Sequence, residues 1–294
     1  MTLVSMQRLL DEAEKGGYAL GYFEAWNLES LEAVMDAAEE MRSPVILGFR
    51  GGFSESPHRL DSPHLELYAA LGLAVARITT VPVCLLLNEI SSLEWVEKAI
   101  GLGFNAVMLD SSHLPFEENL SITKKVVEMA HRAQVAVEAQ LGRLPEGKGD
   151  EKGDLKTDPA LAKEFVEQTG IDALSVSVGN IHLLQEELAE IDLEHLAKIS
   201  EKVKLPLVIH GGSGFPSQAV RQVIELGVRK FNVGTILKES FLEGMRQVSL
   251  EAHPQLILGS GTNKDILVAG KMAMKRKLKE LLELYGSVGK ADAI

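Results

Sequence analysis

Short apolar runs alternate with longer amphipathic segments along almost the whole chain. The runs are rich in Val, Ile and Leu at consecutive positions, which is typical of strands buried on both faces. The segments between them repeat apolar residues at helical spacing, and several open with an N-cap residue or an early proline and close at glycine. We expect strands in residues 17–23, 44–49, 81–87, 105–110, 135–139, 172–178, 206–210 and 230–234.

This alternation predicts an α/β protein whose parallel sheet is covered by helices. Eight strand–helix units over about 250 residues match the (β/α)8, or TIM, barrel. A doubly wound open sheet is the alternative, but it rarely has eight strands, and no glycine fingerprint follows the first run. We expect the polar stretch 142–158 to be a loop, and residues 271–286 to add a C-terminal amphipathic helix. The prediction is one TIM-barrel domain over residues 1–294.

Composition narrows the setting and the partners. The chain has 294 residues, 46% of them hydrophobic, and a formal charge of -12, which disfavours nucleic acid or an anionic membrane surface as a partner. The single cysteine, Cys84, cannot form an internal disulfide and fits a reducing compartment. Residues 1–17 are typical of a short amphipathic helix, and no apolar run approaches the roughly 18 residues of a membrane span. We expect a cytoplasmic protein.

Polar side chains follow or end several of the expected strands. In a TIM barrel, the loops after the carboxyl ends of the strands carry the chemistry. Two histidines and several carboxylates on one rim have the composition of a metal site, although either histidine alone would more often be a packing residue. The polar residues at these positions are Asn88, Glu89, Asp110, Ser111, Glu138, Asn180, His182, His210 and Asn232.

A glycine-rich turn follows the seventh expected strand. Residues 209–216 read I-H-G-G-S-G-F-P, and the eighth strand ends in N-V-G-T at 232–235. Glycines between a strand and a helix leave backbone N–H groups free to bind an anion, although glycines also serve tight turns. Because phosphate sites in TIM barrels lie after strands seven and eight, we interpret this turn as a phosphate site.

These residues resemble the class II, metal-dependent ketose-bisphosphate aldolases, the family of fructose- and tagatose-bisphosphate aldolases. The matching stretches run nearly from end to end and in order. They are VMLDSSHLPFEENLSITKKVVEMAH (107–131), VAVEAQLGRL (135–144), KTDPALAKEFVEQTGIDALSVSVGNIH (156–182), PLVIHGGSGFP (206–216), KFNVGTILK (230–238) and YGSVGKA (285–291). The resemblance implies a barrel that acts on a phosphorylated ketose.

The resemblance also implies roles for individual residues. His182 and His210 match two of the family's three metal-binding histidines. Asp110 and Glu138 match carboxylates that flank the metal and can hold a second ion. The positions that match ligands of the phosphate and polar groups of dihydroxyacetone phosphate are Gly179, Gly211, Ser213, Asn232 and Thr235.

The match breaks after the third strand. There the family usually reads His-Leu-Asp-His, in which the Asp is the acid/base and the last His is the third metal ligand, whereas residues 86–89 read Leu-Leu-Asn-Glu. Glu24 and Trp26 stand where the family commonly has Asn, and Leu183 replaces a glycine that commonly follows the metal histidine. The strand-three pair, Asn88 and Glu89, therefore marks altered chemistry in the site.

With Glu89 in place of a histidine, the expected ligand set is Glu89, His182 and His210, with Glu138 nearby. Two imidazoles and one carboxylate bind Zn²⁺ in hydrolytic enzymes and also suit Mn²⁺, Fe²⁺ or Co²⁺. The additional negative charge should make the ion a weaker Lewis acid. We expect Zn²⁺ as the cofactor.

The loss of the aspartate changes the proton-transfer step. An amide such as that of Asn88 cannot exchange protons near neutral pH. The acid/base role would therefore pass to Glu89, Glu24, Asp110 or a metal-bound water, or be lost, and Glu89 cannot easily be both a tight ligand and a free base.

Three functions fit these residues. We expect a metal-dependent aldolase or related lyase that works on a phosphorylated ketose through a dihydroxyacetone-phosphate-like enediolate. An isomerase or epimerase using the same metal and phosphate sites is the second possibility, and a non-catalytic sugar-phosphate-binding relative is the third. The apolar stripe of the terminal helix, together with the resemblance, predicts a homo-oligomer, either a dimer or a tetramer.

Overall fold

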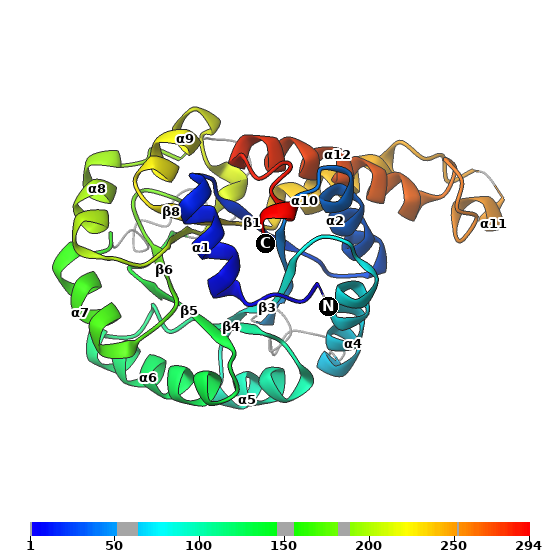
Figure 1. Ribbon diagram of the computed structural model, residues 1–294. Coiled ribbons are helices and arrows are strands. Elements are labelled where there is room, and N and C mark those ends of the chain that lie inside the picture. Colours follow the sequence, from blue (N-terminus) through cyan, green and yellow to red (C-terminus); the bar gives the residue numbers. More distant parts are fainter. Residues whose placement is uncertain (1, 52–63, 146–155, 182–188, 252) are drawn as a thin grey trace.

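Parallel strands close into a barrel that is surrounded by helices (Figure 1). The computed structural model describes residues 2–51, 64–145, 156–181, 189–251 and 253–294. Within these residues, eight strands pair in sequence order, and the eighth pairs with the first. The expected (β/α)8 fold is confirmed. The strands are β1 (Leu20–Glu24), β2 (Val45–Arg50), β3 (Val83–Ile90), β4 (Ala106–Leu109), β5 (Ala136–Leu141), β6 (Ala173–Val176), β7 (Leu207–Ile209) and β8 (Val228–Val233).

Each expected run overlaps one strand, with ends that differ by a few residues. The difference that matters for the site is in β3, which extends to Ile90. The sequence analysis placed Asn88 and Glu89 after the strand. In the structure they lie inside it. The pairing of β3 with β4 shifts register between Leu87 and Ile90, so the two polar residues occupy an irregular end of the strand.

The helices begin and end at residues that satisfy their terminal backbone groups. Side chains of Asn27, Ser92 and Asp158 accept hydrogen bonds from first-turn N–H groups, and Gly103 and Gly170 close helices in the left-handed conformation. Among the described residues, no helix has both the length and the hydrophobicity to cross a bilayer. The helices are α1 (Met6–Gly16), α2 (Leu28–Glu40), α4 (Leu65–Ile78), α5 (Leu93–Leu102), α6 (Phe116–Arg132), α7 (Pro159–Thr169), α8 (Leu193–Lys202), α9 (Ser217–Glu225), α10 (Thr235–Arg246), α11 (Pro254–Ile257) and α12 (Ile266–Tyr285), with 3-10 turns at η1 (Gly212–Gly214) and η2 (Ala291–Ala293).

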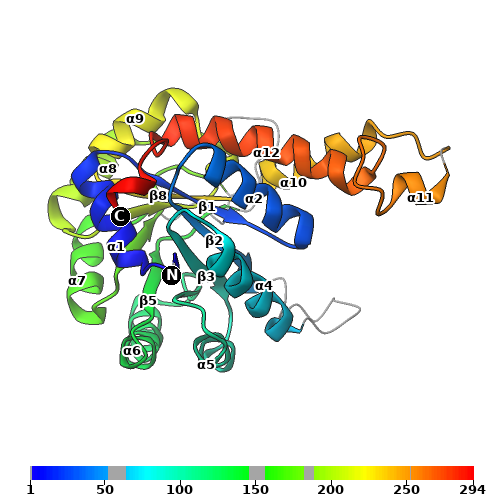
Figure 2. The same ribbon diagram turned by 45° about the vertical axis from the view of Figure 1, so that its right-hand side comes forward.

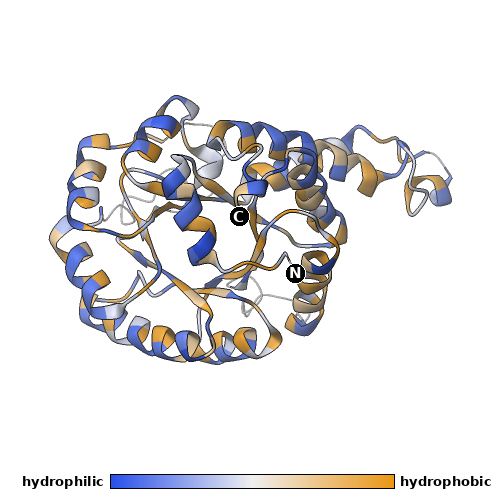
Figure 3. Cartoon of the chain, in the orientation of Figure 1, coloured by the Kyte–Doolittle hydropathy of each residue, from blue (hydrophilic) through white to orange (hydrophobic). Residues whose placement is uncertain are grey.

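Two apolar layers hold the barrel together. The outer layer lies between the strands and the surrounding helices, and Figure 3 shows how the helices turn polar faces outward from it. The inner layer fills one end of the barrel, where Met6, Leu9 and Leu10 of α1 pack with Tyr22 and Leu86. Figure 1 shows α1 lying across this end of the ring. Because α1 closes the end at which the strands begin, the opposite end, where they finish, is left for a site.

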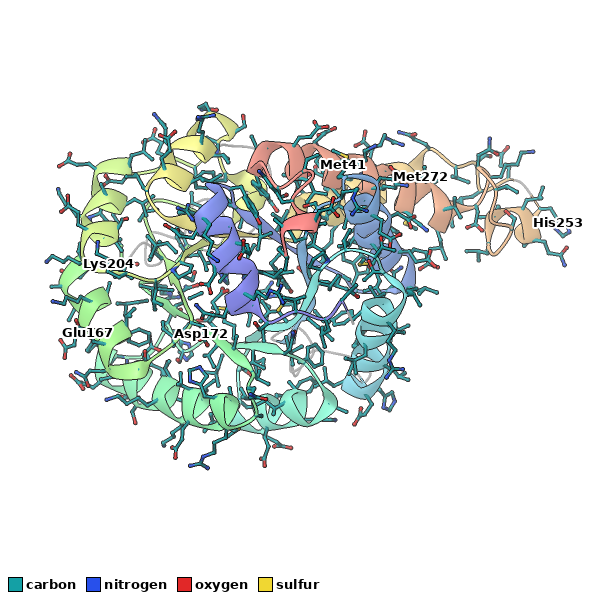
Figure 4. The ribbon with its side chains drawn as sticks, viewed as in Figure 1. Met41, Glu167, Asp172, Lys204, His253 and Met272 are labelled. Atoms are coloured by element: carbon teal, nitrogen blue, oxygen red, sulfur yellow. The ribbon has the colours of Figure 1, made fainter. Side chains whose placement is uncertain are left out.

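The C-terminal helices extend beyond the barrel. The expected terminal helix is confirmed as α12, although it starts earlier, at Ile266. It packs along α2 and α10, and its first turns leave the barrel together with α11 as an arm, which is clear in both ribbon views (Figures 1 and 2). In Figure 4, His253 marks the outer part of this arm and Met272 lies on α12.

Candidate active site

A pocket opens at the carboxyl ends of β1, β2, β3, β7 and β8. It has about 500 Å³ of space, including its mouth. Eight of its lining residues are among those that the sequence singled out as candidates: Glu24, Asn88, Glu89, His210, Gly211, Ser213, Asn232 and Thr235. Val233 and Gly234 belong to the N-V-G-T turn that the sequence also singled out, and Tyr22, Arg50 and Lys238 were not anticipated.

The end of β3 brings Asn88 and Glu89 to this pocket by an unusual backbone conformation. Glu89 has a φ of 52°, in the left-handed region that residues with a side chain rarely adopt. This conformation and the register shift let two consecutive residues, which would point to opposite faces of a regular strand, both line the pocket. The Asn88 amide donates a hydrogen bond to Glu89 Oε1 at 3.3 Å. Such a local strain is typical of functional positions.

Arg50 forms an ion pair with Glu89. It is the last residue of β2, and the pairing of β2 with β3 places it opposite Asn88. The guanidinium Nε contacts Glu89 Oε2, and both side chains are largely buried, with 21% and 12% of their surfaces exposed. Sequence reasoning missed Arg50 because it treated the polar residues of each strand separately. The available signal was an arginine at the end of an otherwise apolar strand.

His210 lies between two carboxylates at the end of β7. Its Nδ1 is 3.4 Å from Glu89 Oε1, and its Nε2 is 2.8 Å from Glu138 Oε1. Burial opposes protonation of the ring, but hydrogen bonds to Glu138 and Glu89 outweigh it and raise the pKa of His210. The backbone is held as well, since the Asn180 amide donates to the carbonyl of His210 at 2.9 Å.

Beneath His210, a buried charged network crosses the barrel interior. Lys230 Nζ lies 2.6 Å from Glu138 Oε2, both side chains are fully buried, and the ammonium also contacts Asn232 Oδ1. Burial disfavours the ionised form of Glu138, but Lys230 and His210 outweigh it and lower its pKa. Burial lowers the pKa of Lys230, partly offset by Glu138. Sequence reasoning missed Lys230, although it stands two residues before Asn232 and therefore on the same inward face of β8.

The donors at the pocket fit a divalent ion. Two ligands about 2.1 Å from one Zn²⁺ in tetrahedral geometry are separated by roughly 3.4 Å. The distance between His210 Nδ1 and Glu89 Oε1 has this value. Within the described ranges, no three His, Cys, Asp or Glu side chains gather closely enough to hold a metal, and the third expected ligand, His182, lies outside those ranges.

Glu138 occupies a different place from the other expected ligands. It contacts the ring nitrogen of His210 that faces away from Glu89. A carboxylate on the second nitrogen of a metal-binding histidine orients the ring and increases its basicity. The geometry therefore favours a supporting role for Glu138 over direct coordination.

The glycine turn after β7 lies beside the start of α10 at the pocket. Gly211 has a φ of 72°, and a Cβ on Gly212 would come within 2.9 Å of the Asn232 carbonyl oxygen. The Ser213 hydroxyl accepts a hydrogen bond from the Ile236 N–H at 3.0 Å, which joins the turn to the first turn of α10. The N-cap residue of α10 is Gly234, which has no side chain to accept hydrogen bonds from the first turn. The N-terminus of α10, where the helix dipole is positive, therefore faces the pocket beside Thr235.

Glu24 closes the other side of the pocket. It ends β1 and forms an ion pair with Lys238 of α10 at 2.6 Å. The position depends on Gly234, because a Cβ there would lie 2.2 Å from Glu24 Oε2. Trp26 lies beside this pair, with the Lys238 ammonium 5.7 Å from its ring centre and its edge packed on Phe241.

Among the described residues, three expected site residues do not line the pocket: Glu138, whose contacts are given above, Asp110 and Gly179. Asp110 Oδ1 instead accepts hydrogen bonds from the backbone and hydroxyl of Ser112, at 3.0 and 2.7 Å. Gly179 adopts a φ of 101° and packs so closely that a Cβ would lie 2.1 Å from the Glu190 carbonyl oxygen. These contacts are local to the segments that follow β4 and β6.

Tyr22 contributes a buried hydroxyl to the pocket. Its ring lies 5.1 Å from the Lys230 ammonium, and its hydroxyl has no hydrogen-bond partner within the part of the chain that the structure describes. Burial, reinforced by Glu24 and Glu89, raises the pKa of Tyr22 well above its usual value. The phenol therefore keeps its proton at neutral pH and can only be used there as a neutral donor or acceptor.

Known proteins resemble this chain over most of its length. The family model for fructose-bisphosphate aldolase class-II matches residues 4–290. The YdjI aldolase from Escherichia coli K12 is 32% identical, with a TM-score of 0.83 over 98% of this chain and 99% of that one. A protein from Coccidioides immitis, proposed to be a fructose-1,6-bisphosphate aldolase, is 27% identical, with a TM-score of 0.84 and 98% of both chains covered. The fructose-bisphosphate aldolase of Campylobacter jejuni is 25% identical, with a TM-score of 0.80 over 98% of this chain and 97% of that one.

Proposed function

We propose that this chain, which belongs to the class II fructose-bisphosphate aldolase family, is a divalent-metal-dependent aldolase that cleaves or forms a C–C bond in a phosphorylated ketose. Membership of the family, together with the aldolases of similar structure, makes the chain a carbon–carbon lyase. The metal and the substrate are the proposed parts. They are supported by one observation: Glu89, His210 and the glycine turn at 211–214 share a single pocket.

The proposed metal ligands are Glu89, His210 and His182, with Glu138 orienting the ring of His210. A divalent ion, Zn²⁺ in the first instance, would polarise the ketose carbonyl and stabilise the enediolate formed on C–C cleavage. The chain's own part is to hold the donors in place. The strained backbone of Glu89 and the contact between Glu138 and His210 fix the two carboxylates around one imidazole.

The proposed substrate end is a phosphate group at the start of α10. The backbone of Gly211, the hydroxyls of Ser213 and Thr235 and the helix dipole offer donors to an anion there. Asn232 lies between this end and the imidazole, with its amide nitrogen 2.7 Å from His210 Nε2. It is well placed to bind a polar group of the ketose between the phosphate and the ion.

Proton transfer is the step in which this chain departs from its family. Asn88 cannot exchange protons near neutral pH, and Asp110 does not line the pocket. Glu89 is assigned to the metal. We therefore propose Glu24 as the base, because it lines the pocket and Lys238 holds its carboxylate in a fixed position.

The test is deuterium exchange into dihydroxyacetone phosphate. The purified protein is incubated with this compound in deuterated water, with Zn²⁺, Mn²⁺ or Co²⁺ or with EDTA, and the C3 proton is followed by NMR. The assay needs the ion, the phosphate site and the base, but it does not need the unidentified aldehyde. We expect exchange that depends on the metal and is abolished in His210→Ala and Glu89→Ala.

The control is His131→Ala, which removes an exposed histidine of α6 that pairs with Asp172 away from the pocket. Exchange in this variant should equal that of the wild type. Failure of the folded wild-type protein to exchange with any metal would contradict the proposal. Exchange that survives in EDTA would contradict metal dependence alone, and exchange that survives Glu24→Gln would reassign the base.

We also propose a cytoplasmic homo-oligomer that binds neither nucleic acid nor membranes. The single cysteine, Cys84, is fully buried, which suits a reducing compartment. The arm formed by the ends of α10 and α12 and the segment between them carries large apolar side chains that are exposed, among them Leu250 and Leu258. A second copy of the chain is the proposed cover for them.

A further inference from the structure

We propose that Arg50 is a positioning residue that tunes the metal site: it fixes the Glu89 carboxylate and offsets its charge, so that the ion sees a carboxylate ligand with nearly the charge of a neutral imidazole. The inference rests on the proposed function, because it assumes that Glu89 and His210 hold a divalent ion. It goes beyond that function in assigning a role to a residue of β2 that does not itself ligate.

Geometry ties Arg50 to the proposed ligand. The two carboxylate oxygens of Glu89 have different contacts, since Oε2 meets the Arg50 guanidinium and Oε1 faces His210 Nδ1 at 3.4 Å. One oxygen is thereby held by a cation, and the other is turned toward the imidazole. The register of β2 against β3 builds this arrangement into the barrel, because Arg50 pairs with Asn88, the residue before Glu89.

The charge of the Arg50 guanidinium would affect how strongly the proposed ion acts as a Lewis acid. The carboxylate of Glu89 would neutralise one of the two charges of the ion, which would weaken the pull of the ion on a carbonyl oxygen. A guanidinium bound to the same carboxylate withdraws electron density from it. Because both side chains are largely buried, solvent screens this effect less than it would at the surface. Arg50 would therefore loosen the ion slightly while keeping it a strong Lewis acid.

We expect loss of the Arg50 charge to have opposite effects on metal binding and on turnover. Arg50→Gln removes a cation close to a divalent ion and leaves the Glu89 carboxylate to the metal alone. We expect metal binding that is about ten-fold tighter, since a change of this size needs only a modest electrostatic difference. At saturating metal we expect exchange of the dihydroxyacetone phosphate proton to be slower, by about ten-fold. A residue that served only the fold would weaken both.

The experiment measures Zn²⁺ affinity by competition with a chromophoric chelator, and the absorption spectrum of the Co²⁺-loaded protein. Wild type is compared with Arg50→Gln, Arg50→Met and Arg50→Lys, and circular dichroism checks that each is folded. Arg50→Met keeps the apolar stem without charge, and Arg50→Lys keeps the charge without the planar fork. The matched control is Arg132→Gln, which removes an exposed arginine that pairs with Glu128 on α6.

Tighter binding with slower exchange in the two neutral variants, near-wild-type affinity in Arg50→Lys and no change in Arg132→Gln would support the role of Arg50. If the wild-type protein binds Zn²⁺ but Arg50→Gln and Arg50→Met bind it with the same or weaker affinity, the proposed role of Arg50 is wrong. The proposed metal site would still stand in that case. If wild-type protein binds no divalent ion, the proposed metal site fails and the role of Arg50 fails with it. A Co²⁺ spectrum that is insensitive to Glu89→Gln would also overturn it, because Glu89 would then not be a ligand.

Discussion

Single residues at the strand ends carry most of what separates this pocket from its family. Under the proposed function, Glu89 would supply a metal-binding donor at the position where the resemblance implies a histidine, and Asn88 would remove the proton-transfer group. The neighbouring ion pairs, Arg50 with Glu89 and Lys238 with Glu24, place a cation beside each of the two pocket carboxylates. The role of each carboxylate therefore has to be considered together with that of the cation beside it.

Strand-end reasoning predicted the residues that are polar where a barrel strand finishes, such as His210 and Asn232. It missed Arg50 and Lys230, because the residues that they pair with, Glu89 and Glu138, lie on other strands. Lys230, for example, meets Glu138 only after three more strands have closed the barrel. Asp110 was expected at the pocket, but its carboxylate is taken up by a local turn at Ser112. Such competition between local and distant partners is not visible in one sequence.

The buried pair of Lys230 and Glu138 makes a stability prediction. Lys230→Met leaves the Glu138 carboxylate buried without its cation, so we expect the free energy of unfolding to fall by about 3–5 kcal/mol. The measurement is urea denaturation followed by circular dichroism. Glu138→Gln combined with Lys230→Met removes both charges and should recover part of this loss. A single variant as stable as the wild type would mean that the pair does not contribute to folding.

Tyr22 makes the opposite prediction. Its hydroxyl is buried without a hydrogen-bond partner among the described residues, so Tyr22→Phe should raise the free energy of unfolding by about 1 kcal/mol. If the hydroxyl donates to the bound ketose, the same variant should exchange the substrate proton more slowly. Denaturation and the exchange assay together test both effects. A destabilised Tyr22→Phe would show that the hydroxyl is satisfied by a group or water outside these contacts.

At the scale of the elements, helix termini explain why the amphipathic segments stop and start as they do. The sequence predicted that several of these segments open at an N-cap residue or an early proline and close at glycine, because capping is local chemistry. It did not predict the irregular end of β3, since a register shift arises from pairing with β4. Asn88 and Glu89, which this irregular end brings to the pocket, were therefore predicted to follow the strand, whereas they lie within it.

The N-cap of α12 gives a prediction about pH. Asp265 is buried, and burial disfavours its ionised form, but hydrogen bonds from the Gly261 and Leu267 N–H groups, at 3.0 and 3.1 Å, outweigh it and lower its pKa. A carboxyl with a lowered folded-state pKa stabilises the fold above its unfolded pKa of about 3.9, and this contribution is lost as the pH falls through the folded pKa. Asp265→Ala should therefore cost about 1 kcal/mol at neutral pH.

The measurement is the free energy of unfolding of wild type and Asp265→Ala between pH 7 and pH 3. The two curves should approach each other as the pH falls toward the lowered pKa of Asp265, because protonation removes the charge of the acceptor in the wild type. Asp265→Asn, which keeps an oxygen acceptor, should lose less at neutral pH than Asp265→Ala. A constant difference between wild type and Asp265→Ala over the whole range would contradict the assignment to the ionised carboxylate.

At the scale of the whole molecule, the barrel could be predicted from the sequence. The same strand–helix pattern occurs eight times along the chain, and every occurrence indicates the same architecture. The closure of one end by α1 could not be predicted, since an amphipathic helix at the start of a chain could pack at many places. This closure leaves one end of the barrel accessible, and the pocket residues that were expected from strand ends meet there.

The arm is the remaining feature that the barrel does not explain. It extends away from the barrel in both ribbon views, and Figure 4 shows His253 and Met272 marking its length. Leu250 and Leu258 are 70% and 57% exposed, which is unfavourable for large apolar side chains gathered on one projection. We expect these side chains to be covered by a second copy of the chain.

Light scattering coupled to gel filtration tests this expectation. Wild type should have the mass of a dimer or tetramer, and Leu250→Glu combined with Leu258→Glu should reduce it, because buried carboxylates would separate the copies. Leu67→Glu is the matched control, since Leu67 is 62% exposed on α4, away from the arm. A monomeric wild type at micromolar concentration would contradict the assembly, and an unchanged mass in the double variant would assign it to another surface.

The arm is built from α10 and α12, and α10 also supplies Thr235 and Lys238 to the pocket. Any loss of substrate-proton exchange when the copies dissociate would therefore connect the assembly to the pocket through α10.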